Sequence, residues 1–443
     1  MKSLILTGVL LITRQAFASS NACRADFCIR EHEPIAQTEQ TDSTSHKMRH
    51  HIAFDFRPDY ILPTNKYLRG QSGVLPPRTA LAVNLKYGFR FAPDCYFGRN
   101  YPHTVQGIGV GYHTFFNPSE MGNPLAVYVF QTSRIASLTS KLSLDYEWNF
   151  GVSLGWKKYD PVKNPWNTAV GSYANAYINL GVLLNWQLAS STNLKAGMGF
   201  THFSNGNTRY PNAGINTAGA YIGISHDFGK ENFSEYSRNL PVQEDCHGRF
   251  VQRITYDVVV YGAVRKKGVF PDGVTPVIAP GVFAVGGLNF TPLYRVNRYF
   301  RTGISLDVQY DESANIVDHI ANPDGATSGF EAKFYKPPFR EQFGVGLSAR
   351  AELVMPIFSI NIGIGKNLIC KGADTNSFYQ ILALKTDITQ RFFLHVGYQL
   401  YRFKDPNNLM LGIGYRFGRR TTKPESRHQS APAPAKKIKN RVP

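Results

Sequence analysis

The sequence lacks the long apolar segment that a membrane-spanning helix requires. After the N-terminus, no apolar run approaches the roughly 20 residues needed to cross a bilayer. Charge is also scarce, because only 18% of the 443 residues are charged, which is low for a soluble protein. Short stretches of alternating apolar and polar or small residues are separated instead by Gly, Pro, Asn and Asp. This pattern predicts an all-β protein.

Cysteine is sparse and odd in number, so at least one thiol has no partner within the chain. The five cysteines are Cys23, Cys28, Cys95, Cys246 and Cys370. A small Cys23–Cys28 disulfide loop is compatible with an exported chain. The cysteine spacings do not fit a zinc site, and we expect no metal ligand among them.

Acidic residues are outnumbered, which gives a formal net charge of +18. Part of the excess lies in residues 419–443, where eight Lys and Arg accompany Glu425 as the one acid. With its prolines, this segment is expected to be a disordered basic tail. The tail is either a solvated extension or a contact for an anionic surface such as lipid phosphates. We expect no nucleic-acid partner for an exported protein.

The N-terminus has the pattern of an export signal. Lys2 precedes an apolar core at Leu4–Ile12, and Ala16-Phe17-Ala18 supplies a small-residue cleavage site. Residues 1–18 are therefore predicted to be a signal peptide, and residues 19–48 a periplasmic lead-in. An exported chain with amphipathic strands and no helical span is typical of an outer-membrane β-barrel. The alternative is a secreted β-sandwich.

The remaining chain divides into two strand-rich halves, 49–230 and 251–418, joined by a polar linker at 231–250. The first half has expected strands at 52–62, 80–91, 105–116, 125–132, 142–157, 173–188, 193–204 and 216–228. The second half has them at 254–265, 281–290, 299–310, 343–353, 357–365, 378–386, 391–401 and 409–417. Two eight-stranded antiparallel transmembrane barrels fit this pattern, and so does one barrel of about sixteen strands.

A weak repeat relates the halves, and its alignment places Leu400 and Arg402 where the first half has His202 and Ser204. The second half is thus expected to be a degenerate repeat barrel without the polar residues of the first, or part of one larger barrel.

Three polar residues interrupt an otherwise apolar strand face in the first half. Side chains two apart share one face of a strand. His202 and Ser204 continue an apolar face, and Asn216 begins the apolar face of the next strand. Polar groups facing lipid are unfavourable unless they are paired or functional. The alternative is that these residues only cap a tight hairpin turn.

The three side chains have the chemistry of a serine hydrolase. Ser204 is the expected nucleophile, His202 the base that takes its proton, and Asn216 the group that orients the imidazole across the strand pair. Asn205 and Gly206 are expected to bind the oxyanion through backbone N–H groups, and Asn212 is expected to help position the substrate.

The constellation of His202, Ser204, Asn205, Pro211, Asn212, Gly214 and Ile215, with the upstream run 122–130, resembles the lipid A 3-O-deacylase (PagL, acyloxyacyl hydrolase) family. That resemblance implies an eight-stranded barrel with the His-x-Ser on its penultimate strand. The family has Glu where this chain has Asn216. The same motif with Asn twelve residues after the Ser also resembles outer-membrane phospholipase A, whose triad is Ser-His-Asn. Phospholipase A binds calcium near an Arg that is Asn207 here.

The resemblance to the deacylases implies an outer-membrane serine esterase that removes an acyl chain from lipid A of lipopolysaccharide. With both barrel ends periplasmic, the 205–215 loop faces the outside, where lipopolysaccharide resides. We expect no cofactor, and calcium only if the chain is a phospholipase A. Outer-membrane lipid surrounds the barrel, and a homodimer is compatible with the sequence. A third possibility is a porin-like or scaffold barrel with a vestigial site.

Overall fold

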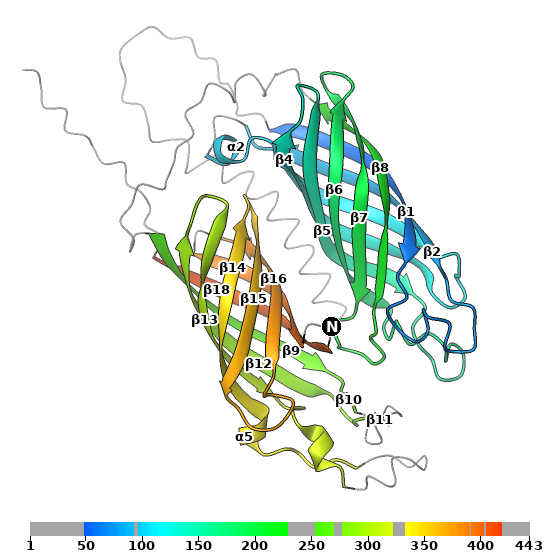
Figure 1. Ribbon diagram of the computed structural model, residues 1–443, viewed down its shortest axis with the longest axis vertical. Coiled ribbons are helices and arrows are strands. Elements are labelled where there is room, and N and C mark those ends of the chain that lie inside the picture. Colours follow the sequence, from blue (N-terminus) through cyan, green and yellow to red (C-terminus); the bar gives the residue numbers. More distant parts are fainter. Residues whose placement is uncertain are drawn as a thin grey trace, which may run out of the picture.

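The computed structural model describes residues 48–92, 96–228, 253–269, 277–321, 333–389, 391–402 and 405–418. Most of these residues lie in antiparallel strands (Figure 1). Residues 1–18, nearly all of 19–48, the linker 231–250, the tail 419–443 and the pair Cys23–Cys28 lie outside the described residues. No helix in the described part of the chain is long and apolar enough to cross a membrane.

The first half of the chain forms a closed barrel of eight strands in sequence order. These are β1 (Arg49–Ile61), β2 (Thr79–Arg90), β3 (Val105–Thr114), β4 (Gly122–Ser137), β5 (Leu142–Trp156), β6 (Ala174–Gln187), β7 (Thr192–Ser204) and β8 (Ile215–Phe228), with the short helix α2 (Tyr96–Asn100) between β2 and β3. We call this unit the N-barrel.

The second half forms another closed barrel of eight strands, which we call the C-barrel. Its strands are β9 (Ile254–Arg265), β12 (Phe283–Arg295), β13 (Phe300–Asp311), β14 (Phe343–Val354), β15 (Phe358–Ile369), β16 (Phe378–Asp387), β17 (Phe392–Tyr401) and β18 (Asp405–Phe417). The two-stranded sheet of β10 (Gly268–Val269) and β11 (Val277–Ile278), the 3-10 helix η2 (Ile316–His319) and the helix α5 (Phe339–Gln342) lie in its connections.

Hydrogen bonds between first and last strands close each barrel. β1 pairs with β8, so that Tyr60 lies opposite Ala218, and β18 pairs with β9. The alternatives of one sixteen-stranded barrel and of a β-sandwich are therefore wrong. The predicted repeat has a topological basis, because β7 and β17 are each the seventh strand of their barrel. Leu400 lies on β17 and Arg402 just beyond its end.

The barrel walls are apolar outside and polar inside, as the period of two predicts for a membrane-spanning barrel. On β8, Ile222 and Ile224 are 52% and 48% exposed, whereas Tyr221, Ser225 and Asp227 are buried. Alternation of this kind repeats on β1 and β7. The outer surface therefore offers lipid a continuous apolar belt, while polar groups pair within the lumen.

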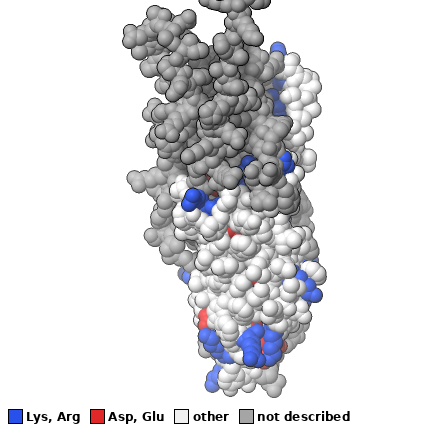
Figure 2. Space-filling view, turned by 90° about the vertical axis from the view of Figure 1, so that its left-hand side faces the viewer, with Lys and Arg blue, Asp and Glu red and all other residues white. Residues whose placement is uncertain are grey.

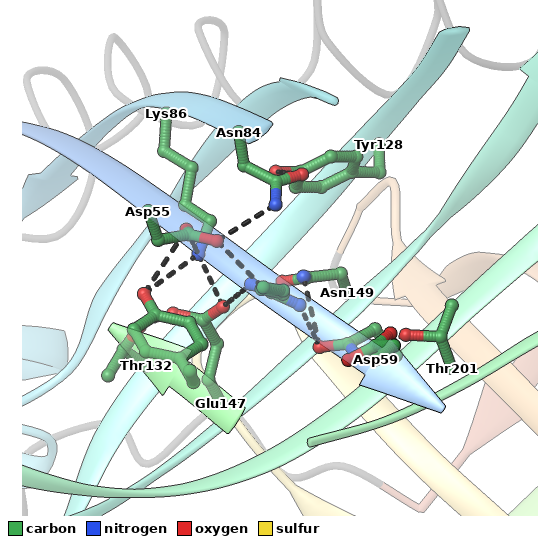
Figure 3. A network of polar contacts seen from close by, with 12 residues as sticks. Asp55, Asp59, Asn84, Lys86, Tyr128, Thr132, Glu147, Asn149 and Thr201 are labelled. Atoms are coloured by element: carbon green, nitrogen blue, oxygen red, sulfur yellow. Dashed lines mark hydrogen bonds and ion pairs between the residues drawn. The ribbon is translucent and has the colours of Figure 1, made fainter. Parts of the chain in front are cut away.

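Charged side chains fill the lumen of the N-barrel (Figure 3). Arg57 Nε donates to Asp55 Oδ1 at 2.7 Å, and Lys86 Nζ lies 2.6 Å from Asp55 Oδ2. Arg57 also reaches Glu147 at 3.0 Å. The C-barrel has its own buried ion-pair network, formed by Asp257, Glu352, Lys385 and Arg416. An eight-stranded barrel is narrow enough for side chains to fill it.

The two ends of the N-barrel differ. One end, the lower end in Figure 1, carries the connections 62–78, 115–121, 157–173 and 205–214, and we call it the long-loop end. The opposite end carries the tight turns 138–141 and 188–191 and the connection 91–104. The first residue of β1 and the last residue of β8 also lie at this end. A buried apolar cluster that includes Tyr67, Phe115, Trp156, Phe203 and Ile215 packs the long-loop half. Packed apolar side chains thus fill the barrel at the long-loop end.

Candidate active site

The three candidate catalytic side chains lie together on the outer wall at the long-loop end. Ser204 is the last residue of β7, and Asn216 is the second residue of β8. His202 and Asn216 are direct register partners. All three are partly exposed and belong to the outward-facing set, whereas Thr201, Phe203 and Thr217 point inward and are buried.

His202 is oriented by Asn216. His202 Nδ1 and Asn216 Oδ1 are 2.7 Å apart. Because an amide oxygen can only accept, this contact requires the proton on Nδ1 and leaves Nε2 as the basic nitrogen. Asn216 is itself held, since its Nδ2 donates to Thr64 Oγ1 at 3.3 Å and its carbonyl oxygen accepts from Leu62 N–H at 2.8 Å.

The side chains of Ser204 and His202 both lie close to Gly214. A Cβ added to Gly214 would lie 3.3 Å from His202 Cε1 and 3.8 Å from Ser204 Cβ. With φ at +71°, Gly214 has a backbone conformation that suits glycine. Among the hydrogen bonds of the described residues, none joins Ser204 Oγ to His202. Catalytic hydrogen bonds are often long before substrate binds.

The loop 205–214 is held by asparagine side chains. Asn205 N–H donates to Asn212 Oδ1 at 2.8 Å, and Asn205 Nδ2 donates to Arg209 O at 2.9 Å. Asn205 N–H, which the sequence indicates as an oxyanion donor, is therefore engaged within the loop. Asn212 Nδ2 is buried and has no hydrogen-bond partner among the described residues. The Asn212 side chain therefore has an unsatisfied donor, and its oxygen is bonded to Asn205, the residue that follows Ser204.

Two other loops fix the position of Gly214, and nothing in the sequence pattern pointed to them. Gly214 N–H donates to Ala169 O at 3.1 Å, and its carbonyl accepts from Asn65 Nδ2 at 3.1 Å. Nearby, Tyr67 OH donates to Glu120 Oε2 at 2.6 Å. Burial and this contact with Glu120 raise the pKa of the Tyr67 phenol. Tyr67 therefore remains a neutral donor that ties two loops together.

The densest cluster of charged groups in the N-barrel is not the reactive site. The side chains of Asp55, Arg57, Lys86 and Glu147 are 0–3% exposed and satisfy one another. Paired, inaccessible charges of this kind stabilise a lumen and have no path to a substrate. In the described ranges, no group of three or more His, Cys, Asp or Glu could hold a metal ion.

The outer-wall site combines the groups that acyl transfer requires. It has a serine two residues from a histidine on the same strand face, an amide that fixes the imidazole tautomer, and a buried N–H donor in the adjoining loop that has no partner among the described residues. A nucleophile, its base and a donor for a developing oxyanion are the parts of a serine hydrolase. All three side chains of His202, Ser204 and Asn216 lie on the outer face of the barrel wall.

Each barrel matches a protein-family model. Residues 85–225 match the model of lipid A 3-O-deacylase (PagL). Residues 254–420 match the model of the acyloxyacyl hydrolase C-terminal domain. The second match was not expected from the sequence, where the C-barrel carried no recognisable motif. No curated protein matches the chain.

Solved structures similar to this chain include outer-membrane barrels. The outer membrane enzyme PagL is 14% identical, with a TM-score of 0.25 over 39% of this chain and 97% of its own. Neisserial surface protein A is 8% identical, with a TM-score of 0.28 over 40% of this chain and 97% of its own. The N-terminal β-barrel domain of Pseudomonas aeruginosa OprF is 8% identical, with a TM-score of 0.24 over 41% of this chain and 100% of its own.

Proposed function

The chain belongs to the lipid A 3-O-deacylase (PagL) family, and from that premise we propose that its N-barrel removes an ester-linked acyl chain from lipid A of lipopolysaccharide. It is a β-barrel protein of the bacterial outer membrane. The observation that carries the proposal is the contact of His202 Nδ1 with Asn216 Oδ1, on the lipid-facing wall and beside Ser204. A hydrolytic site facing lipid suits an ester that is itself part of the membrane.

The proposed reaction is acyl transfer through a serine ester. Ser204 Oγ attacks the ester carbonyl carbon while His202 Nε2 takes the hydroxyl proton. The tetrahedral intermediate then collapses and the bond between the acyl carbon and the sugar oxygen breaks. His202 gives its proton to that oxygen, so the sugar leaves as an alcohol. Water then gives a proton to His202 Nε2 and attacks the acyl carbon of the Ser204 ester. The bond from that carbon to Ser204 Oγ breaks, His202 returns the proton to Ser204 Oγ, and the fatty acid is released. Asn216 keeps the imidazole in the required tautomer throughout.

The proposed oxyanion donors are Asn212 Nδ2 and Gly206 N–H. Asn212 Nδ2 is buried and has no hydrogen-bond partner in the described part of the chain, so it can donate to a developing negative charge without first losing another partner. Asn205 contributes by fixing Asn212 through its backbone N–H at 2.8 Å. A donor held in place before the reaction is worth about 10²- to 10³-fold in kcat.

The position of the site favours lipid A as substrate. Outer-membrane barrels have short periplasmic turns and longer extracellular loops. The site adjoins the loop 205–214 at the long-loop end, opposite the tight turns 138–141 and 188–191. This supports a site in the outer leaflet, where lipopolysaccharide resides.

Mass spectrometry of lipid A from cells with and without the protein tests the function. We expect lipid A that lacks one 3-hydroxyacyl chain, and unmodified lipid A with Ser204→Ala. Asn216→Ala loses a hydrogen bond to the charged imidazole, worth about 1–3 kcal/mol, so we expect a 5- to 150-fold lower rate. Asn216→Asp retains the acceptor and should retain activity.

Two outcomes would contradict the proposal. Full deacylation by Ser204→Ala would exclude the site. Unchanged lipid A with fatty acid released from phospholipid would assign the chain to phospholipase A activity instead. A calcium chelator distinguishes the two activities further. We expect the lipid A reaction to proceed in its presence, because calcium is expected only for phospholipase A.

A further inference from the structure

The loop that carries the proposed oxyanion donors touches the C-barrel at two places. Asn207 Nδ2 donates to Asn407 O at 3.2 Å, at the start of β18. A Cβ added to Gly206 would lie 2.5 Å from Leu409 Cγ and Cδ2. At the other contact, a Cβ added to Gly268 would lie 3.0 Å from the Tyr210 ring. The loop is thus packed between its own barrel and the C-barrel.

The C-barrel residues that make these contacts are themselves fixed. Arg265 Nη1 donates to the side-chain oxygen of Asn407 and pairs with Asp311 at 3.0 Å. Asn407 Nδ2 donates to Asn408 Oδ1 at 2.8 Å. All four residues are buried. The carbonyl that receives Asn207 is therefore anchored to the polar interior of the C-barrel.

A second contact region joins the barrels at the opposite end. Trp148 Nε1 donates to Met355 Sδ at 3.2 Å, and Tyr299 OH donates to Asn100 O at 3.2 Å. Phe89, Phe91 and Val129 share an apolar cluster with Ile357, Phe358 and Leu384. In both barrels this end has tight turns, at 138–141 and 355–357. The two barrels therefore lie side by side with their tight turns at the same end (Figure 1). This arrangement is required if both barrels cross one membrane in the same orientation.

We propose that the C-barrel is a positioning element of the active site, acting through Leu409 on the loop 205–214. Leu409 lies on the outward-facing set of β18 and covers the αL backbone of Gly206, whose φ is +63°. Filling that side of the loop limits its excursions and keeps Asn212 beside Ser204. This inference rests on the proposed function, because the donors it positions belong to that reaction.

Three full-length variants test the inference. Leu409→Ala removes the cover, and we expect kcat for lipid A deacylation to fall by up to about 100-fold, the scale of an ångström-sized misplacement, with little change in KM. Leu409→Met refills the space and should restore kcat. Leu411→Ala, on the same face of β18 but away from the loop, is the matched control. Wild-type kcat in a folded Leu409→Ala protein would overturn the inference.

A readout independent of activity separates this inference from the proposed function. Arg209 is exposed within the loop, so trypsin cleavage after it reports the order of the loop. We expect Leu409→Ala to be cleaved several-fold faster than wild type, and Leu411→Ala at the wild-type rate. Equal cleavage of all three proteins would refute the positioning role. An inactive wild type with the expected cleavage pattern would instead refute only the proposed function.

A coupled substitution adds a steric test. Gly206→Ala places a methyl group against Leu409, so we expect it to lose activity. The double variant Gly206→Ala/Leu409→Ala lacks this clash. Leu409→Ala should therefore raise kcat when it is added to Gly206→Ala, whereas it lowers kcat when it is added to wild type. Independent effects of the two substitutions would mean that Leu409 does not act on the loop.

Discussion

The side-chain amides of Asn216 and Asn212 differ in how completely they are hydrogen-bonded. The amide of Asn216 is used at both ends, by His202 at 2.7 Å and by Thr64 at 3.3 Å. Among the residues that the structure describes, the amide of Asn212 is bonded only at its oxygen, which accepts from Asn205 N–H at 2.8 Å, and its buried Nδ2 has no partner. A buried donor without an acceptor is unfavourable by about 1–3 kcal/mol. Its persistence beside Ser204 is explained if the reaction supplies the acceptor.

Asn212→Asp separates the observed hydrogen bond at the Asn212 side-chain oxygen from the proposed donation by its Nδ2 to the oxyanion. The aspartate can still accept the Asn205 N–H but has no Nδ2 to donate, so the loop is retained and the oxyanion loses a donor. We expect kcat for deacylation to fall about 10²- to 10³-fold, with a smaller change in KM. Steady-state kinetics of purified Asn212→Asp would check this. A kcat equal to that of wild type would show that Asn212 donates nothing to the transition state.

At the scale of the strand, the period of two decides which side chains meet lipid. The outward set of β8 includes Ile222, which is 52% exposed, and it begins with Asn216 at the long-loop end. The polar groups of the candidate site are tolerated there because they lie at the rim, where His202 pairs with Asn216. The same groups at mid-strand would face hydrocarbon.

Arginine substitution measures this depth dependence. Ile222→Arg places a charge on the lipid face near the middle of β8, and we expect it to lower the free energy of unfolding by about 2–4 kcal/mol. Leu188→Arg is the control, because Leu188 is 50% exposed at the tight turn after β6 and should lose about 1 kcal/mol or less. Denaturant unfolding in lipid vesicles provides the values. Equal destabilisation by both would mean that this face does not contact hydrocarbon.

At the scale of the whole molecule, two filled barrels stand in place of one wide pore. Buried ion pairs occupy each lumen, around Asp55 and Glu147 in the N-barrel and around Asp257 and Glu352 in the C-barrel. Figure 2 shows a face on which Lys and Arg lie mainly near the lower end and beside the atoms drawn in grey, with a largely uncharged surface between. This distribution suits a membrane belt between two polar rims.

Filled lumens predict that the protein does not conduct solutes. In planar bilayers we expect no single-channel steps from the purified full-length protein, since Lys86 and Arg57 lie across the N-barrel and are bound to carboxylates. Bilayer conductance recordings, with a general porin as positive control, give the answer. Reproducible conductance steps would favour the interpretation of the chain as a porin-like barrel over its interpretation as a hydrolase.

The arrangement of the candidate site was largely predictable because it depends on neighbouring residues of one hairpin. The strand positions, the shared outward face of His202, Ser204 and Asn216, and the pairing of His202 with Asn216 all follow from a period of two and one hairpin. The supporting residues Thr64, Ala169 and Leu409 come from other loops and the other barrel. No local pattern marks them, because their role arises only when distant segments meet.

The sequence by itself determined that this chain is a set of amphipathic strands, and that one hairpin places three polar residues on the outward face of its strands. Only the tertiary structure decided how the strands close. His51 and Asp227 meet although they are 176 residues apart, and this pairing makes eight strands a barrel. An edge strand has the same alternation whether its partner is β1 or β9, so strand pairing is a long-range choice. The same choice brought Leu409 against the loop beside Ser204.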